Sequence, residues 1–315
     1  MVRWRLKKSY TKRTQPQKHS VPRNIMQFSS EFIKRLEKLG INPDIYSKRT
    51  QKAVQIFDSS IEEQLKTAFG VYPVPWSSEC YFTEQANEIF REYPDKVFIK
   101  DPISCVPVIA LEPGEKEVLD ICAAPGSKTI DICQKAEWVV ANDIDRNRIK
   151  RLRENVKRYN IRNITITNKD ARFLKFKHNM NFDRILVDAP CSGEGIINKI
   201  EKTMKLWSLK RIQRLSRMQH QILTNAWSLL KPGGILVYST CTFSPEENEA
   251  VISGLMKNNN AGLEEIKIKG LASSHSLTSW NGKQFHKDIK KCLRIYPQHN
   301  GTNGFFVAKV RKLII

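Results

Sequence analysis

The sequence predicts an α/β protein with an open, mostly parallel sheet that follows a smaller N-terminal region. From about Glu115 onward, short apolar runs alternate with longer amphipathic runs, which is the pattern of strand, helix, strand units. The first apolar run leads into a turn of small residues with a glycine, as at the sheet edge where such folds bind ligands. The chain has 315 residues, 40% hydrophobic and 27% charged, as in globular proteins.

Six apolar runs are expected to form the strands of this sheet. They are VLDI (118–121), WVVAND (138–143), ITITN (164–168), RILVD (184–188), ILVYST (235–240) and GFFVAKVRK (304–312). The last of them is expected at an edge of the sheet. Two long helices are expected over 145–160 and 208–230, the second because its apolar residues recur on one helical face.

The N-terminal part of the chain is expected to contain helices and a basic arm. Residues 25–110 are predicted to form a mainly helical region, with helices at 29–40, 59–70 and 83–94. Ser60 and Glu63 match a capping box for the second of these helices. Residues 1–24 contain eight Lys or Arg and no acidic residue, which predicts a flexible arm. The sheet then occupies 111–315.

The charge balance favours a polyanionic partner, because 53 Lys and Arg against 32 Asp and Glu leave a net charge of +21. No apolar stretch approaches the roughly 20 residues that span a bilayer, and the N-terminus lacks the apolar core of a secretory signal. An intracellular protein without membrane contact is therefore expected. The seven cysteines form no Cys-x-x-Cys pair and no metal-ligand spacing, so they are expected to be thiols, with no metal site.

A nucleoside cofactor is indicated at the carboxyl ends of the first strands. The turn CAAPGSKT is neither a phosphate-binding loop nor a Gly-x-Gly-x-x-Gly fingerprint, which argues against NTP and NAD. Asp143 follows the second strand about 20 residues after the turn, where a carboxylate can accept both ribose hydroxyls. Asp170, after the third strand, could accept from an adenine amino group, and Asp188, after the fourth, could hold an ammonium or a base.

Two cysteines lie at the same rim and suggest covalent chemistry on a pyrimidine. Cys191 follows the fourth strand in DAPCSGEG, and Cys241 follows the fifth in STCTFSPEENE. Cytosine carbon 5 accepts a methyl group only after a thiolate has added at carbon 6. Asp188 would stabilise the ring as a protonated acid or through the amino group, and Lys128 would neutralise developing charge or aid thiolate formation. Ser244 and Glu247 match a capping box just after Cys241, where a helix dipole would favour a thiolate.

These motifs resemble the Nop/Sun (RsmB/Nop) family of RNA 5-methylcytosine methyltransferases. DICAAPGSKT, DAPCSGEG and YSTCTFSPEENEAV carry the resemblance, which extends from about Asp101 to the final strand. It implies a methyltransferase-type Rossmann sheet of seven strands with the last one antiparallel, S-adenosylmethionine (AdoMet) as cofactor, and a small N-terminal RNA-binding region. It also implies that Cys241 is the nucleophile and that Cys191 helps release the product, a choice that the chemistry alone leaves open.

The resemblance implies a full set of site residues. The catalytic residues would be Cys241, Cys191, Asp188 and Lys128. The cofactor would contact Cys122, Ala123, Ala124, Pro125, Gly126, Ser127, Lys128, Asp143, Arg148, Asp170 and Asp188. Ser127 and the tail SLTSWNGKQFHKDIKKCLRIYPQHNGTNGFF (276–306) are most like archaeal tRNA enzymes, so tRNA is the expected substrate and rRNA the alternative.

The target base must leave its helix to reach the cysteines, so unpaired or flipped-out RNA is expected. Phe243, Trp207 and Trp280 are candidate stacking partners, and the basic helix over 145–160 is a candidate phosphate-binding surface. Two other functions remain open at this stage: a DNA cytosine methyltransferase that attacks with Cys191, and a non-catalytic RNA-binding protein. A cytoplasmic monomer is expected, or a nuclear or nucleolar one in a eukaryote, and a partner protein is left open.

Overall fold

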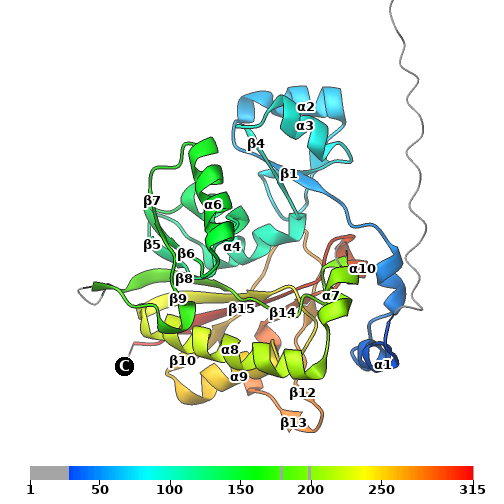
Figure 1. Ribbon diagram of the computed structural model, residues 1–315, viewed down its shortest axis with the longest axis vertical. Helices are drawn as coiled ribbons and strands as arrows, with labels where there is room; N and C mark the ends of the chain where they lie inside the picture. Colours follow the sequence, from blue (N-terminus) through cyan, green and yellow to red (C-terminus); the bar gives the residue numbers. More distant parts are fainter. Residues whose placement is uncertain (1–27, 178–179, 198–199, 315) are drawn as a thin grey trace, which may run out of the picture.

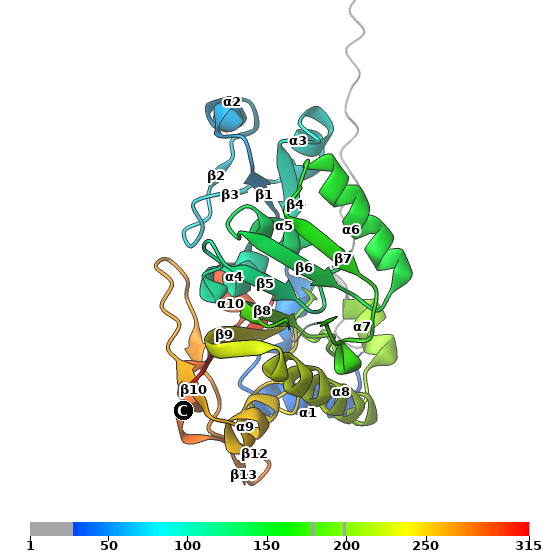
Figure 2. The same ribbon diagram turned by 90° about the vertical axis from the view of Figure 1, so that its left-hand side faces the viewer.

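The computed structural model describes residues 28–177, 180–197 and 200–314, so the predicted basic arm lies outside the described residues. A central sheet separates two helix layers (Figures 1 and 2). One layer contains α4 (Val106–Leu111), α5 (Ser127–Cys133) and α6 (Arg146–Arg158), and the other contains α8 (Leu209–Ser228) and α9 (Glu249–Asn258). A smaller unit with its own sheet stands beyond the first layer (Figure 1). Within the described residues, no helix is both long and apolar enough to cross a membrane.

The central sheet has the strand order β11-β14-β15-β9-β8-β5-β6-β7, and β10 also pairs with β15. Its strands are β5 (Glu117–Asp120), β6 (Trp138–Asn142), β7 (Ile164–Thr167), β8 (Phe182–Asp188), β9 (Leu230–Thr240), β10 (Ala261–Glu264), β11 (Ser274–His275), β14 (Leu293–Ile295) and β15 (Phe305–Lys312). Strands β7, β6, β5, β8 and β9 are parallel, whereas β15 runs antiparallel to β9. Parallel strands therefore end at one common edge.

The predicted fold class is confirmed, because all six expected strands are present and the last one is antiparallel. The expectation that this last strand lies at an edge is wrong. Strand β15 pairs with β9 and with β14, and β10 also pairs with it. The short strands β10 and β11 extend the expected seven strands to nine. Strands of two to four residues carry too little alternation to be predicted.

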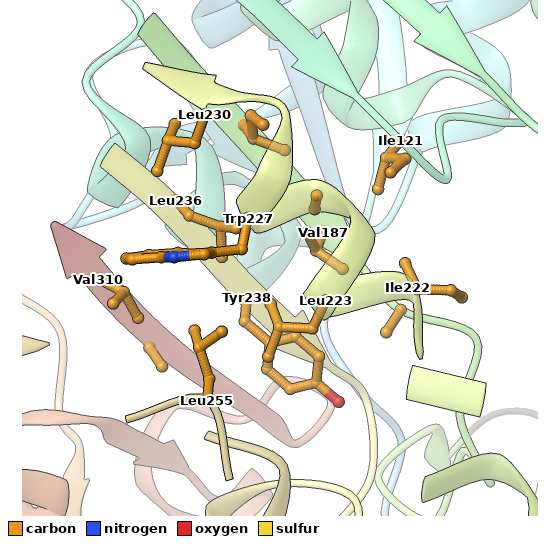
Figure 3. Packing of buried hydrophobic residues seen from close by; sticks show 14 of the residues in the cluster. Ile121, Val187, Ile222, Leu223, Trp227, Leu230, Leu236, Tyr238, Leu255 and Val310 are labelled. Carbon is orange, nitrogen blue, oxygen red and sulfur yellow. The ribbon is translucent and has the colours of Figure 1, made fainter. Parts of the chain in front are cut away.

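Both faces of the central sheet are buried, which explains why its strands are continuous apolar runs. Successive residues point to opposite faces, so Val187 and Leu236 pack toward α8 and α9, while Leu186 and Val237 pack toward α4 and α5. Figure 3 shows Trp227 of α8 beside the sheet in the first of these clusters. Burial of each aliphatic side chain of this kind stabilises the folded protein by about 1.5–3 kcal/mol.

Besides its helices, the N-terminal region has strands that were not expected from the sequence. It contains a four-stranded antiparallel sheet in the order β2-β3-β1-β4. The strands are β1 (Ala53–Ile56), β2 (Tyr72–Pro73), β3 (Cys80–Phe82) and β4 (Val97–Lys100), and the helices are α2 (Glu62–Phe69) and α3 (Ala86–Glu92). These elements enclose a separate small core around Val54, Leu65 and Ile89. The strands are too short to leave a clear period-two pattern in the sequence.

The start of α2 also differs from its prediction. The helix begins at Glu62, and a preceding turn is capped by Asp58, which accepts a hydrogen bond of 3.0 Å from the Ser60 amide. The predicted capping box of Ser60 and Glu63 is therefore wrong: Ile61 precedes the helix without a side-chain cap, and the Glu63 carboxylate pairs with Lys66. Gly70 ends the helix in the left-handed conformation, as expected.

Helix α1 (Ser30–Lys38) does not belong to the small sheet unit. It begins where Ser29 caps the Phe32 amide, and its apolar face packs against Ile197, Phe243 and Trp280. The region 25–110 is thus divided into three parts. Helix α1 packs on the domain that contains the central sheet, β1–β4 form the small unit, and α4 belongs to the first helix layer. Helix α1 consequently lies against the segments that follow both sequence-predicted cysteines.

Candidate active site

A cavity of about 430 Å³ opens where the parallel strands end. Because these ends share one edge, residues from five separate strands meet there. The predicted residues that line the cavity are Cys122, Asp143, Arg148, Asp170, Asp188, Cys191 and Cys241. Residues 123–128 are not among the lining residues. They form the turn next to the cavity and make hydrogen bonds to Asp143 and Arg148, which line it.

The turn after β5 is fixed to the ends of β5 and β6. The Thr129 hydroxyl donates to Asp120 over 2.7 Å, and the Ala124 amide donates to Asp143 over 3.1 Å. Gly126 has φ +112°, and a Cβ there would lie 2.7 Å from a methyl group of Leu152. A φ of this size is strained for a residue with a side chain, so the turn favours glycine. Burial raises the pKa of Asp120 to about 7.

Asp143 is held by three groups while it lines the cavity. Its carboxylate accepts hydrogen bonds from the amides of Ala124 and Asp145, and it forms an ion pair of 3.1 Å with Arg148. Arg148 also donates to the Ala124 carbonyl. The first turn of α6 is therefore tied to the turn after β5, which fixes the carboxylate at the end of β6.

Asp170 and Arg172 form a second pair on the cavity wall. The Arg172 guanidinium donates to both carboxylate oxygens of Asp170, with a shortest distance of 2.6 Å. These hydrogen bonds lower the pKa of Asp170 and keep it ionised. The carboxylate remains free to accept a further donor from the cavity, since an ionised carboxylate has about four acceptor sites.

Asp188 pairs with Lys128 beneath the thiols. Lys128 Nζ lies 2.7 Å from Asp188 Oδ2, and the Ser239 hydroxyl donates to Asp188 Oδ1 over 2.7 Å. Both contacts use Asp188 as an acceptor. Lys128 reaches this carboxylate without lining the cavity itself.

The two predicted cysteines are direct neighbours. Cys191 Sγ lies 3.2 Å from Cys241 Sγ, and both residues line the cavity. The hydrogen bond with Cys241, followed by burial, raises the pKa of Cys191 well above its ordinary value. Cys191 thus holds its proton and can donate it toward the Cys241 sulfur.

The segment after Cys241 is not a helix start, so the prediction made for Ser244 and Glu247 is wrong. Helix α9 begins at Glu249 after Asn248. The Glu247 side chain instead accepts hydrogen bonds of 2.9 Å from the Ser192 amide and from Gln219. It therefore fixes the segment that carries Cys191, and burial raises its own pKa to about 7.

Glu194 joins the two cysteine segments, and the sequence reasoning missed it. It follows Cys191 and is almost completely buried. Its carboxylate accepts four hydrogen bonds, from Trp207 Nε1 (2.8 Å), Thr242 Oγ1 (3.1 Å), the Phe243 amide (3.2 Å) and Ser244 Oγ (3.1 Å). A buried acid needs such partners, and the acid inside the otherwise small-residue motif CSGEG was the available signal.

Backbone contacts bring the same segments together. The Gly195 amide donates to the Cys241 carbonyl over 2.9 Å, and the Gly304 amide donates to the Gly195 carbonyl over 2.9 Å. A Cβ on Gly195 would lie 2.6 Å from the Gly304 oxygen, so a larger residue would separate the chains. The distance between the thiols therefore depends on packing from three distant parts of the sequence.

The three aromatic residues predicted to stack on a base do not line the cavity. Phe243 and Trp280 are buried beside α1, and Trp207 donates to Glu194. Phe243 and Trp280 thus take part in hydrophobic packing, and the Trp207 ring is held by its partly buried hydrogen bond to Glu194. The basic side chains of α6 are mostly exposed to solvent, apart from Arg148 at the cavity.

Comparison with known proteins agrees with this arrangement. Residues 108–311 match the family described as 16S rRNA methyltransferase RsmB/F. A tRNA (cytosine(49)-C(5))-methyltransferase of Pyrococcus abyssi is 36% identical over 261 residues, which cover 80% of this chain and 83% of the relative. A ribosomal RNA small subunit methyltransferase F of Serratia proteamaculans is 33% identical over 252 residues, which cover 76% of this chain and 51% of the relative.

Solved structures show the same fold. A methyltransferase homolog from Pyrococcus horikoshii aligns with a TM-score of 0.75 and 28% identity, over 90% of this chain and 100% of the other. The chain spans about half the length of the rRNA relatives that it matches, such as those of Serratia proteamaculans and Escherichia coli. The profile match covers more than half of the chain, and the chain therefore belongs to the RsmB/F (Nop/Sun) family of RNA cytosine-5 methyltransferases, which use AdoMet as methyl donor.

Proposed function

We propose that the protein methylates carbon 5 of a cytosine in tRNA through a covalent bond between Cys241 Sγ and cytosine carbon 6. The observation that carries this proposal is the pair of thiols 3.2 Å apart in a cavity lined by acidic strand ends. Cys191 keeps its proton because of its contact with Cys241 and its burial. The family resemblance implies that Cys241 is the nucleophile, and a cysteine attacks as its thiolate.

The residues around the cavity fit AdoMet. The volume of about 430 Å³ lies within the usual range for small-molecule sites. Asp143, with 2% of its side chain exposed, would accept the ribose hydroxyls, and Asp170 would accept the adenine amino group. Cys122 and Arg148 would complete the wall, with residues 123–128 as the supporting turn. AdoMet supplies the electrophilic methyl group when bound.

The protein's own residues would supply the attack on the ring, support for the ring and protonation of the leaving sulfur. Cys241 Sγ adds to carbon 6, and Asp188 accepts a hydrogen bond from the cytosine amino group while Lys128 holds the carboxylate. After methylation, a base removes the carbon 5 proton, the electrons of that bond re-form the double bond between carbons 5 and 6, and the bond from sulfur to carbon 6 breaks. Cys191 lies 3.2 Å from that sulfur and can protonate it as it departs, which favours product release.

The choice of tRNA over rRNA is supported by the relatives. The archaeal tRNA enzyme is matched over 83% of its length, whereas the rRNA enzymes are matched over about half of theirs. The small unit of β1–β4, the exposed basic face of α6 and the predicted arm of residues 1–24 would contact RNA phosphates. We infer an intracellular enzyme that acts as a monomer.

The proposal is tested by transfer of labelled methyl groups from AdoMet to unmodified tRNA, rRNA and DNA, followed by a denaturing gel. Wild-type protein is expected to label tRNA, Cys241→Ala to be inactive, and Cys191→Ala to retain RNA in a covalent adduct. Cys133→Ala, at a buried cysteine outside the cavity, is the matched control and should behave as wild type. Activity of Cys241→Ala, or labelling of DNA alone, would make Cys191 the nucleophile; labelling of rRNA alone would replace tRNA as substrate.

A further inference from the structure

Phe173 presents an aromatic side chain to solvent next to Arg172, which lines the cavity. Its exposed fraction is 69%. Arg172, the preceding residue, lines the cavity, and its guanidinium lies 5.2 Å from the centre of the Phe173 ring. Phe173 is not among the lining residues, so its ring stands outside the space that would hold the cofactor.

The exposure of Phe173 belongs to a well-fixed turn. Asp170 accepts a hydrogen bond of 3.0 Å from the Arg172 amide at the start of the turn. Asn225 of α8 donates to the carbonyls of Ala171 and Leu174 over 2.9 and 3.0 Å, and Leu174 is completely buried. The residues on both sides of Phe173 are therefore anchored, and the ring is held outward by the fold.

The cavity that Arg172 lines also has apolar and basic side chains from α7 (Ile200–Leu206) and α8. Leu206 and Leu209 are also exposed, at 52% and 36%, and they come from the end of α7 and the start of α8. Lys202 and Arg211 line the cavity beside them. Single exposed apolar residues are ordinary on protein surfaces, but apolar side chains interleaved with cations at one opening suit a nucleic-acid strand.

We propose that Phe173 is a stacking platform for the base of a nucleotide that flanks the target cytosine in unpaired RNA. The inference rests on the proposed RNA methyltransferase function and adds a subsite to it. A cytosine that enters the cavity loses its stacking neighbours, and an aromatic ring next to Arg172 offers a replacement for one of them. Arg172 supports the platform from the cavity side. Since every base has a π face, this subsite selects an unpaired strand more than a sequence.

The test measures binding of a fluorescein-labelled single-stranded RNA of about 12 nucleotides, with one cytosine between adenosines, by fluorescence anisotropy. A second RNA has abasic residues on both sides of the cytosine. Phe173→Ala should bind the intact RNA roughly tenfold more weakly than wild type, and Phe173→Trp should restore affinity. With the abasic RNA, the difference between wild type and Phe173→Ala should disappear.

The matched control is Trp138→Ala, which removes an exposed aromatic side chain at the opposite, amino end of β6 and should leave RNA affinity unchanged. AdoMet affinity is measured for the same variants by calorimetry and should not change. The proposal is overturned if Phe173→Ala binds intact RNA as wild type does, if the loss persists with abasic RNA, or if AdoMet affinity falls instead. Failure of the wild type to bind or methylate RNA would reject the proposed function itself.

Discussion

Replacing Glu247 by Gln should change how the stability of the protein depends on pH. Glu247 is buried beneath the Cys191 segment, and its Oε2 accepts hydrogen bonds from the Ser192 amide and Gln219. Its Oε1 is buried with no hydrogen-bond partner in the described residues, and the same holds for Gln219 Oε1. Burial, with a smaller contribution from the charge of Glu194, raises the pKa of Glu247 from 4.5 to about 7. Glutamine keeps the shape and removes the charge.

The sign and size of the effect follow from the two pKa values. Between pH 4.5 and about 7 the folded state binds a proton that the unfolded state has released, so the free energy of unfolding falls as pH rises. Below pH 4.5 Glu247 does not lower the free energy of unfolding, and above about pH 7 its effect is complete. A shift from 4.5 to about 7 corresponds to about 3 kcal/mol. Relative to wild type, Glu247→Gln should therefore gain about 3 kcal/mol between pH 4 and pH 8.

Urea unfolding at several pH values measures this difference directly. Comparing the variant with wild type cancels the contributions of other acids, such as Asp120, whose pKa burial also raises to about 7. Glu265→Gln, at an exposed acid paired with Lys267, is the matched control and should leave the pH profile unchanged. Parallel stability curves for Glu247→Gln and wild type would refute the reasoning, because they would show that Glu247 ionises freely in the folded protein.

Two further substitutions test the groups that hold the thiols. Glu194→Gln turns one carboxylate oxygen into a donor that faces another donor, either Trp207 Nε1 or the Phe243 amide. It should therefore lower the free energy of unfolding in urea by about 2–4 kcal/mol. It should also lower kcat with little change in AdoMet affinity, and an unchanged kcat contradicts the link between the cysteine segments. Arg294→Met should lower the free energy of unfolding in urea by about 3–5 kcal/mol, because it leaves Glu249 buried without its ion-pair partner at 2.6 Å. Adding Glu249→Leu to this variant should recover stability. If the double variant shows no recovery, the buried unpaired charge is not the cause of the loss.

The sequence predicted the central sheet well because both of its faces are buried. Continuous apolar runs such as 184–188 and 235–240 have few other structural solutions between amphipathic helices. The acids at the strand ends were also predictable, because parallel strands must bring their carboxyl ends to one edge. Cys191 and Cys241 follow neighbouring strands β8 and β9, so their proximity follows from the strand order.

The supporting contacts were not predictable because they are made between distant segments. Ser244 and Glu247 have the spacing of a capping box, yet Glu247 instead binds Ser192 and Gln219, which lie on other elements. A local pattern cannot reveal such partners, and tertiary contacts override it. The same reason explains why α1 was assigned to the N-terminal region, although its apolar face contacts Phe243 in the active-site domain.

Charge pairing explains how a cavity lined by three carboxylates can serve an enzyme that binds a polyanion and carries a net charge of +21. Each acid that lines the cavity has its own cation: Asp143 with Arg148 at 3.1 Å, Asp170 with Arg172 at 2.6 Å and Asp188 with Lys128 at 2.7 Å. The carboxylates can therefore accept hydrogen bonds without presenting uncompensated negative charge to an approaching RNA phosphate. Lys202 and Arg211 add positive charge at the same cavity. Removing one cation of a pair should thus weaken RNA binding in addition to disturbing the carboxylate that it holds.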